Sequence, residues 1–264
     1  MDIRGARALV TGATGGIGQE IATRLHGLGA SVLVTGRRSE ELDALVAALP
    51  GSRAIVADLV DPVEVDRLLA EIGPIDLLVA NAALPATGRL EAFTTEELDR
   101  ALAVNLRAPM VLAHGVLPGM LERGSGHIVL ISSIAGKMPT ARLSVYVATK
   151  YALRGFGASL RQDLAGTGVS ASVVFPGSVI DGGMLTDAGL GVPQGTKGTT
   201  VAAVADAVVR AVEHDRGEVD AAELLVRAVA KAVGVVPSLA DRLGRQRLTQ
   251  AYGEELAEKL RHKR

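Results

Sequence analysis

Short apolar runs alternate along this chain with longer segments in which apolar residues recur every three or four positions. The runs are mostly apolar throughout, rather than at alternate positions, which indicates strands buried on both faces of a parallel sheet. The six runs are Arg7–Thr11, Ser31–Thr35, Arg53–Ala57, Ile75–Ala80, His127–Ser132 and Ser170–Phe175. The periodic segments predict helices at Ile17–Leu28, Ser39–Leu49, Pro62–Ile72, Thr95–Leu121, Ser144–Leu164 and Thr200–His214.

This alternation predicts a doubly wound α/β sheet with helices on both faces. In such a sheet the ligand binds at the carboxyl ends of the strands, so the loops that follow the apolar runs are the places to search for chemistry. No repeat of fixed period interrupts the pattern.

The composition excludes several other classes of protein. The chain has 264 residues, a net charge of −1 and no cysteine, so a disulfide scaffold, a thiolate nucleophile and a Cys-ligated metal site are excluded. The five histidines have no ligand spacing, and we expect no metal. Near-neutral charge and the absence of Trp disfavour nucleic acid as a partner.

No targeting segment is recognisable in this sequence. The first apolar stretch, Ala8–Val10, is shorter than the core of a signal peptide. The longest uncharged run, Leu164–Ile180, contains three Gly and a Pro, which is typical of a loop and a buried strand rather than a membrane span. We therefore expect a cytoplasmic protein.

A glycine-rich turn connects the first predicted strand to the first predicted helix. Its sequence from Thr11 to Gly18 has the spacing G-x-x-x-G-x-G. Gly12 allows a tight turn, Gly16 lets a pyrophosphate approach the backbone, and Gly18 lets the helix pack closely. We expect the dinucleotide to contact Gly12, Thr14, Gly15, Gly16, Ile17 and Gly18.

The end of the second predicted strand determines the choice between NAD and NADP. An acidic residue there would bind the ribose hydroxyls of NAD, but this chain has Arg37 and Arg38. Two guanidinium groups favour a 2′-phosphate, so NADP(H) is expected ahead of NAD(H), although a solvated loop is the alternative. Asp58 and Leu59 follow the third strand; Asp58 is a candidate for the adenine amino group or, alternatively, a helix cap.

The candidate chemistry lies on the fifth predicted helix. Tyr146 and Lys150 are four residues apart and therefore share one helix face, although such a pair also arises by chance. A phenol needs its pKa lowered by about 3 units, near 4 kcal/mol, to exchange protons near neutral pH. A lysine about 4 Å away supplies roughly that energy at an effective dielectric of about 20. We expect Tyr146 to be the proton donor and acceptor, Lys150 to lower its pKa, and Ser133 to hold the substrate oxygen.

The order of these motifs resembles the short-chain dehydrogenase/reductase family, over residues 5 to about 215. The matching motifs are Thr11–Gly18, Asn81-Ala82-Ala83, Asn105, Ser133, Tyr146 with Lys150, and Pro176-Gly177. The resemblance implies a Rossmann-type fold, a catalytic tetrad of Asn105, Ser133, Tyr146 and Lys150, and a homodimer or homotetramer built on the helices that contain Asn105 and Tyr146. In that family the Tyr protonates a carbonyl while the nicotinamide delivers hydride, the Lys also binds the nicotinamide ribose, and the Asn supports a water. The resemblance adds cofactor contacts at Asn81, Ala82, Tyr146, Lys150, Pro176, Gly177 and Val179.

Pro109 lies four residues after Asn105 within a predicted helix. Proline has no N–H, so the Asn105 carbonyl should lack its usual partner and the helix should kink. We hypothesise that this carbonyl binds the relay water; a kink that merely fits the core is the equal alternative.

Two features depart from the family pattern. Ala83 stands where many members have Gly, which is tolerated if its φ is negative. The sequence after Glu218 lacks an apolar closing strand followed by paired glycines, so the seventh strand is the least defined part of the sheet.

Two segments near the end of the chain differ from the strand–helix pattern: a glycine-rich segment after the sixth strand and a basic C-terminal tail. Residues 177–199 are glycine-rich and follow a strand at the active edge, so they predict a mobile lid lined by Met184, Leu185 and Leu190, or a plain surface loop. We expect residues 1–225 to form the dinucleotide-binding catalytic domain and 226–264 a helical extension, with Leu224–Val236 helical and a further helix beginning at Pro237-Ser238. This basic tail packs on its own domain, docks a subunit or, less favoured, touches a membrane.

The sequence therefore predicts an NADP-dependent oxidoreductase that interconverts a carbonyl and an alcohol on a small substrate, broadly an apolar ketone or secondary alcohol. Two alternatives stay open. One is an NADP-binding redox sensor without turnover, which would not need Tyr146. The other is an epimerase or dehydratase with the same Tyr–Lys pair, which the glycine spacing and the short chain disfavour.

Overall fold

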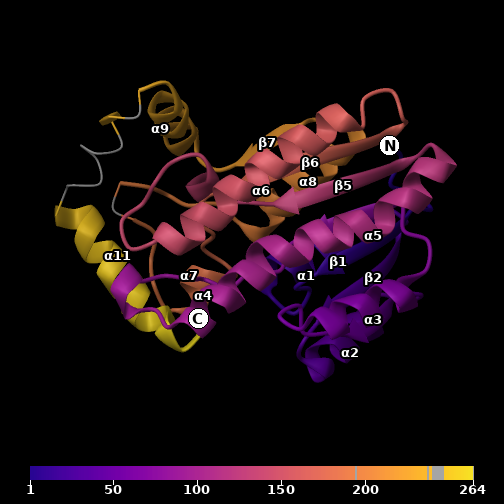
Figure 1. Ribbon diagram of the computed structural model, residues 1–264, viewed down its shortest axis with the longest axis horizontal. Helices are drawn as coiled ribbons and strands as arrows, with labels where there is room; N and C mark the ends of the chain where they lie inside the picture. Colours follow the sequence, from indigo (N-terminus) through magenta and orange to yellow (C-terminus); the bar gives the residue numbers. More distant parts are fainter. Residues whose placement is uncertain (194, 237, 240–246, 264) are drawn as a thin grey trace.

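A computed structural model describes residues 1–193, 195–236, 238–239 and 247–263 of this chain. Seven parallel strands form one sheet in the order β3-β2-β1-β4-β5-β6-β7 (Figure 1). The strands are β1 (Arg7–Thr11), β2 (Ser31–Gly36), β3 (Arg53–Val56), β4 (Leu77–Ala80), β5 (Gly126–Ile131), β6 (Val169–Pro176) and β7 (Glu218–Ala221). The predicted doubly wound sheet of the Rossmann type is confirmed.

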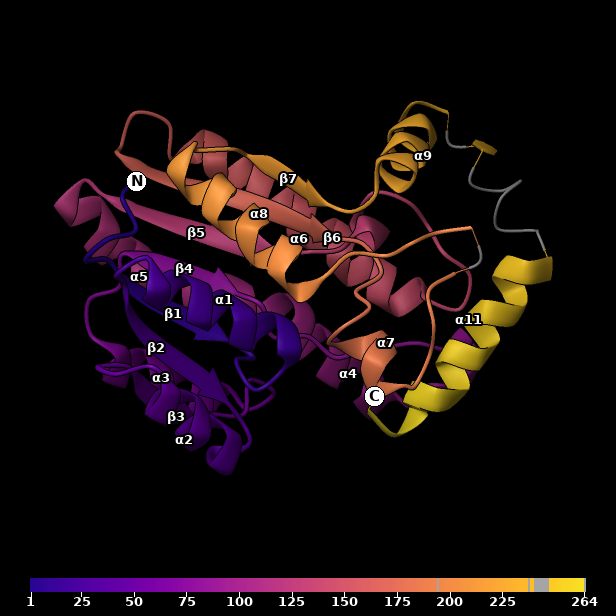
Figure 2. The ribbon, with the colours of Figure 1, turned by 180° about the vertical axis from the view of Figure 1, so that it is seen from behind.

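Helices cover both faces of the sheet, and each face has its own apolar core. One face packs against α1 (Gly16–Gly27), α2 (Ser39–Ala48) and α8 (Val201–Glu213), which Figure 2 shows in front. The other face packs against α3 (Pro62–Ile72), α5 (Ala108–Arg123) and α6 (Ser144–Asp163), in front in Figure 1. The remaining helices are α4 (Thr95–Leu102), α7 (Met184–Asp187), α9 (Leu224–Val235) and α11 (Arg247–Leu260).

Strand β7 was not predicted from the sequence because it is a short edge strand with few apolar residues. Its residues Glu218–Ala221 pair with Val173–Pro176 of β6 and form the edge of the sheet. Three of its four residues are exposed or half-buried, so the strand has no apolar run to detect. Edge strands are often short and charged, which keeps other chains from pairing with them, so they lack the apolar run of a strand that is buried on both faces.

The predicted helix over Thr95–Leu121 is interrupted. Helix α4 passes into a π-helical turn, Ala103–Arg107, before α5 begins at Ala108. Pro109 sits in the first turn of α5, where its missing N–H cannot complete an α-helical bond to Asn105. The kink that was expected at Pro109 thus takes the form of a wider, π-helical turn just before the proline. By length and composition the combined stretch Thr95–Arg123 could span a membrane, and 44% of its apolar 18-residue window is buried inside the protein.

The tail agrees with the prediction in part. The apolar segment expected at Leu224–Val236 forms α9, and part of the helix expected from Pro237 lies outside the described residues. The division at residue 225 remains a prediction.

Gly18 explains how α1 comes so close to β1. A Cβ at this position would collide with the carbonyl oxygen of Gly12. We expect Gly18→Ala to lower the free energy of unfolding by about 1–3 kcal/mol because neither backbone can yield easily. Gly27→Ala, in the same helix, is the control: nothing lies within 4 Å of its Cβ position, and we expect a gain of up to about 1 kcal/mol. Urea unfolding of both variants measures this; equal effects would contradict the close packing.

Candidate active site

The glycine-rich turn makes a cradle at the N-terminus of α1. Gly12 has a φ of +65°, a backbone conformation that side chains rarely adopt, and helix α1 begins at Gly16. Gly15, at the N-cap, provides no capping side chain, so the first N–H groups of the helix are not used by a cap. Such N–H groups, together with the helix dipole, bind phosphate groups. The residues present therefore fit a dinucleotide pyrophosphate.

Asn81 fixes this turn to the neighbouring strand. Its Nδ2 donates to the carbonyl oxygens of Thr11 at 2.9 Å and Gly12 at 3.3 Å. The backbone N–H groups of Asn81 and Ala82 both donate to Thr11 Oγ1 at 3.0 Å. Ala83 is not among the non-glycine residues with positive φ, so the condition for tolerating its methyl group is met. Asn81 is thus an anchor for the turn, whether or not it also touches the cofactor.

The two arginines lie where the sequence placed them, at the end of β2. Arg38 donates from Nη2 to the carbonyl of Thr14 at 2.6 Å and pairs with Glu41 at 2.9 Å. Arg37 Nη1 lies 4.0 Å from Asp58 Oδ2, and more than half of each arginine side chain is exposed. Arg38 is therefore in contact with the glycine-rich turn, Arg37 lies toward Asp58, and both guanidinium groups are open to solvent.

Asp58 does not cap helix α3. That cap is Asp61, whose side chain accepts from the N–H of Val63 at 2.9 Å. Asp58 Oδ1 instead accepts from the N–H of Val60 at 3.0 Å and closes a local turn, while Leu59 is buried beside it. The helix-cap alternative for Asp58 is wrong, and its contact with adenine stays a prediction.

The two serines after β5 have different roles. Ser132 is buried and donates from Oγ to the carbonyl of Lys150 at 2.9 Å, which fixes helix α6 to the strand. Ser133 accepts the N–H of Ala135 at 3.2 Å and is joined by a hydrogen bond to Tyr146. The structure thus brings Ser133, not Ser132, to the phenol.

Tyr146 and Lys150 lie one turn apart on α6, as the spacing predicts. Lys150 Nζ lies 5.5 Å from the centre of the Tyr146 ring and donates to the carbonyl of Ile131 at 2.9 Å. Lys150 is only 2% exposed, whereas Tyr146 retains part of its surface. The ammonium is therefore held between the end of β5 and the face of the phenol.

The electrostatics correct one expectation. Burial raises the pKa of Tyr146 to about 12, and the hydrogen bond with Ser133 opposes this rise only in part. Burial also lowers the pKa of Lys150 to about 8. The protein's own groups therefore do not bring the phenol toward neutrality, because the desolvation of Tyr146 outweighs the attraction expected from Lys150. At pH 7 Tyr146 carries its proton, the form that a proton donor needs.

Asn105 uses its side chain for structure. Its Oδ1 accepts from the N–H of Leu84 at 2.6 Å, and its Nδ2 donates to the carbonyl of Leu84 at 2.9 Å. This pair fixes the loop after β4. The Asn105 side chain is thus satisfied within the protein. Its backbone carbonyl lies in the π-helical turn, and the hypothesis that it binds the relay water stays a prediction.

The segment after β6 passes over the glycine-rich turn. Gly177 donates from its N–H to the carbonyl of Ala221 at 2.9 Å, and Val179 forms a bridge with Thr199. Gly182 lies so close to Gly16 that a Cβ on Gly16 would be 3.0 Å from its Cα. Met184, Leu185 and Leu190, which were expected to line a lid, are half-buried, and the lid itself stays a prediction. The segment thus approaches the cradle at Gly182, and the cofactor contacts expected at Pro176, Gly177 and Val179 stay a prediction.

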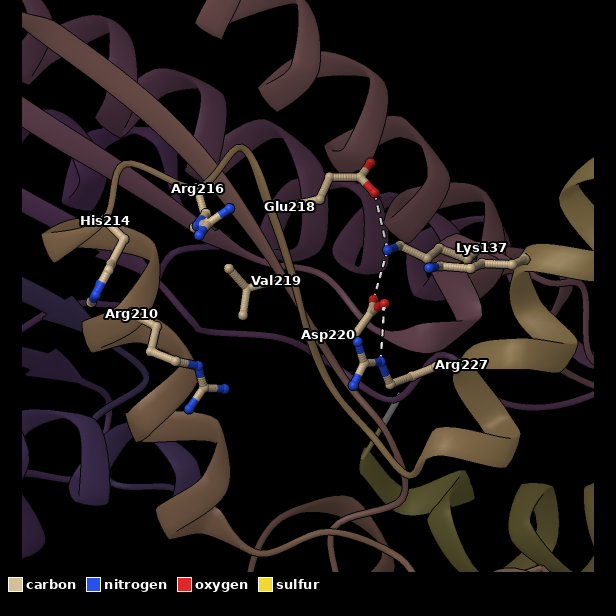
Figure 3. Close-up of a pocket in the computed structure, with 9 residues that line it drawn as sticks. Lys137, Arg210, His214, Arg216, Glu218, Val219, Asp220 and Arg227 are labelled. Atoms are coloured by element: carbon tan, nitrogen blue, oxygen red, sulfur yellow. Dashed lines mark hydrogen bonds and ion pairs between the residues drawn. The ribbon is translucent and has the colours of Figure 1, made fainter.

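Sequence reasoning missed a charged cluster around Lys137, just after the short turn that follows Ser133. Lys137 Nζ lies 2.6 Å from Asp220 and 3.0 Å from Glu218 (Figure 3). It also lies 3.8 Å from the centre of the Phe175 ring. These contacts join the loop after Ser133 to the edge strand. No local pattern could have shown this, because the partners are 83 residues apart. The adjoining cavity, about 710 Å³, runs along β7, and the tetrad residues do not line it.

Comparison with known proteins agrees with this geometry. Residues 6–189 match the family model described as short chain dehydrogenase. The Ketoacyl reductase HetN of Nostoc sp. is 35% identical over 256 residues, which cover 92% of this chain and 89% of the relative. A short-chain dehydrogenase from Sphingobium yanoikuyae in complex with NADPH is 28% identical, with a TM-score of 0.78 over 92% of this chain and 97% of that one. A short-chain dehydrogenase from Streptomyces avermitilis has a TM-score of 0.76 and 28% identity over 92% and 96% of the two chains.

Fold and site together define an oxidoreductase that uses a nicotinamide dinucleotide. The chain belongs to the short-chain dehydrogenase/reductase family.

Proposed function

We propose that this protein is an NADP(H)-dependent reductase that converts a carbonyl to an alcohol on a small, apolar 3-oxoacyl compound. The observation that carries the proposal is the constellation at the end of β5: a protonated phenol, Tyr146, hydrogen-bonded to Ser133 and one turn from a buried Lys150. The substrate class is supported by the similarity to the Nostoc ketoacyl reductase, which extends over nearly the whole of both chains.

Each member of the tetrad has a distinct task. Bound NADPH supplies the hydride. Tyr146 gives its proton to the carbonyl oxygen, and Ser133 holds that oxygen next to the phenol. Below its pKa of about 8, Lys150 carries the positive charge that stabilises negative charge developing on Tyr146. Asn105 holds the loop after β4 and offers its backbone carbonyl to the water that returns the proton.

The preference for NADP rests on Arg37 and Arg38. Related structures that contain NADPH or NADP+ support it. The rule that an arginine at the end of the second strand accommodates a 2′-phosphate gives the physical reason. The sequence directly after β2 has the two arginines in place of the acidic residue that would bind the ribose hydroxyls of NAD, and Glu41 is paired with Arg38.

Two other parts of the proposal concern the whole protein. We propose a homodimer or homotetramer that uses the outer faces of α4, α5 and α6. Leu102 on α4 and Met110 and Leu121 on α5 are exposed apolar residues, and Tyr151 is exposed on α6. We propose a cytoplasmic location from the sequence alone. The redox sensor remains the second candidate function, but it leaves Tyr146 without a task.

Removing either arginine should change the cofactor preference. We expect Arg37→Ala and Arg38→Ala each to lower kcat/KM for NADPH by about 10- to 100-fold, because a charge-assisted hydrogen bond contributes about 1.5–3 kcal/mol. The value for NADH should change much less. The matched control is Arg24→Ala, an exposed arginine at the other end of α1. Equal losses with both cofactors would mean that the arginines support the turn rather than recognise the phosphate.

The experiment that tests the proposed function is NADPH consumption with ethyl 3-oxobutanoate and a panel of other carbonyl compounds. We expect turnover with at least one 3-oxo ester and identification of the alcohol as the product. Tight NADPH binding without turnover of any panel member would instead favour the sensor.

A further inference from the structure

Helix α11 is far from the tetrad in the sequence but packs against the loop that leads into Tyr146. Gly253 of α11 is buried, and a Cβ at that position would lie 2.9 Å from the carbonyl oxygen of Ala141. Glu254 Oε1 accepts from Arg142 Nη2 at 2.6 Å. Since helix α6 begins at Ser144, these contacts lie directly before the catalytic tyrosine.

Glu254 joins a second loop to the same point. Its Oε1 also accepts from Arg89 Nη2 at 3.2 Å, in the segment after β4. The two loops already meet, because the N–H of Gly88 donates to the carbonyl of Arg142 at 2.7 Å. Arg142 has a φ of +63°, a conformation that non-glycine residues adopt mainly where surrounding contacts impose it. The two guanidinium groups hold the pKa of Glu254 below its usual value.

The same helix holds the lid. Tyr252 Oη donates to the carbonyl of Gly191 at 3.0 Å, and Lys259 Nζ lies 3.4 Å from the carbonyl of Gly189. Both acceptors follow α7, in the segment that passes over the glycine-rich turn. Figures 1 and 2 show α11 beside this segment, apart from the helices that cover the sheet.

We propose that α11 is a clasp that limits the size of the substrate, with Tyr252 and Glu254 as its specificity-determining residues. The proposal rests on the proposed reductase function and names a property of the same site. One helix connects the lid on one side to the loops of Arg142 and Arg89 on the other. On this proposal a small 3-oxo ester leaves the contacts of α11 in place, whereas a long acyl chain has to break them.

This arrangement predicts a selective effect of breaking the clasp. A long substrate that displaces α11 has to break the contacts between α11 and the loops, and the free energy of those contacts is subtracted from its binding. A small substrate leaves the contacts intact and loses nothing. Weakening the contacts in advance therefore favours the long substrate over the short one by the same factor. Exposed ion pairs and single hydrogen bonds are weak, so the expected factor for one contact is about threefold to fivefold.

The test compares ethyl 3-oxobutanoate with ethyl 3-oxodecanoate in the full-length protein with NADPH. We expect Tyr252→Phe and Glu254→Gln each to raise the ratio of kcat/KM, long over short, by about threefold to fivefold, and the double variant by about tenfold. Glu258→Gln is the matched control: it makes the same change of charge on an exposed residue of α11 that forms no ion pair within the described part of the chain. An unchanged ratio in both folded variants overturns the proposal.

Two further measurements separate this proposal from the proposed function. Hydrogen exchange of the lid amides, residues 184–191, should be faster in Glu254→Gln than in Glu258→Gln; faster exchange with an unchanged substrate ratio overturns the specificity role. The dissociation constants of the two esters from the NADPH complex should show the same change of ratio without turnover. Binding with the expected ratio but no reduction contradicts the function alone, and binding of neither ester overturns both.

Discussion

Tyr146→Phe should lower kcat for NADPH-dependent carbonyl reduction by about 100- to 10,000-fold, the range for a positioned general acid. The substitution removes one oxygen from a phenol that Ser133 hydrogen-bonds and that keeps its proton at pH 7 because its pKa is about 12. Binding of NADPH should change little, since the nearby Lys150, the turn and the arginines are untouched. Steady-state kinetics and NADPH titration measure the two effects separately.

Tyr151→Phe is the control for this experiment. Tyr151 lies on the same helix but is 39% exposed, and the same atom is removed. Its activity should match that of the parent. If the two variants were equally active, Tyr146 would not be the proton donor and the reductase mechanism would be wrong.

Lys150→Met should make the protein more stable and almost inactive. Burial lowers the pKa of Lys150 from 10.5 to about 8, so the unfolded chain binds this proton more tightly than the folded one. The buried charge therefore costs stability below pH 8, and the cost disappears as the pH rises from about 8 to 10.5. Lowering the pKa from 10.5 to about 8 corresponds to a cost of roughly 3 kcal/mol. The variant also loses the hydrogen bond to Ile131, which contributes about 1 kcal/mol. We therefore expect the free energy of unfolding to rise by about 2 kcal/mol at pH 7.

The expected loss of activity in Lys150→Met comes from the same positive charge, which is unfavourable for folding but favourable for catalysis. The charge that destabilises the fold stabilises the phenolate formed in reduction, so we expect kcat to fall by about 100-fold. In the parent, kcat/KM should decline as the pH rises through about 8, the pKa of Lys150 in the free protein. Urea unfolding at pH 7 and a pH–rate profile measure both effects.

Lys137→Met provides the contrast. Lys137 is also largely buried but is paired with Asp220 and Glu218, so its removal leaves carboxylates without their partner. We expect a loss of about 2–4 kcal/mol. A loss of stability in Lys150→Met as well would show that Lys150 is a structural residue rather than a charge held at a cost for catalysis.

The sequence predicted those parts of the protein that local patterns encode. Buried strands gave continuous apolar runs, and the cradle followed from glycines at a strand–helix junction. Tyr146 and Lys150 share a face because helical geometry fixes the spacing of four residues. Ser133 was expected to hold the substrate oxygen, and the structure shows how it differs from its neighbour: the Ser132 hydroxyl donates to the Lys150 carbonyl instead.

Features that depend on distant partners were not accessible in this way. β7 is an edge strand with a polar sequence, so its position follows only from pairing with β6. The sequence spacing shows that Lys150 is near Tyr146, which favours a lower pKa for the phenol. It does not show how deeply the phenol is buried, and this burial raises the pKa instead. The contacts of α11 with Arg142 and Gly191 connect residues 112 and 61 positions apart, and no periodicity encodes them.

The central claim is that this protein transfers hydride from NADPH to a carbonyl next to Tyr146. Its most direct test is incubation of the protein with ethyl 3-oxobutanoate and NADPH that carries deuterium at the transferable C4 position, followed by mass spectrometry of the product. We predict an alcohol one mass unit heavier, with deuterium on the former carbonyl carbon, and none in Tyr146→Phe beyond the residual rate. Formation of the alcohol without deuterium, or equal formation in both proteins, would contradict the account.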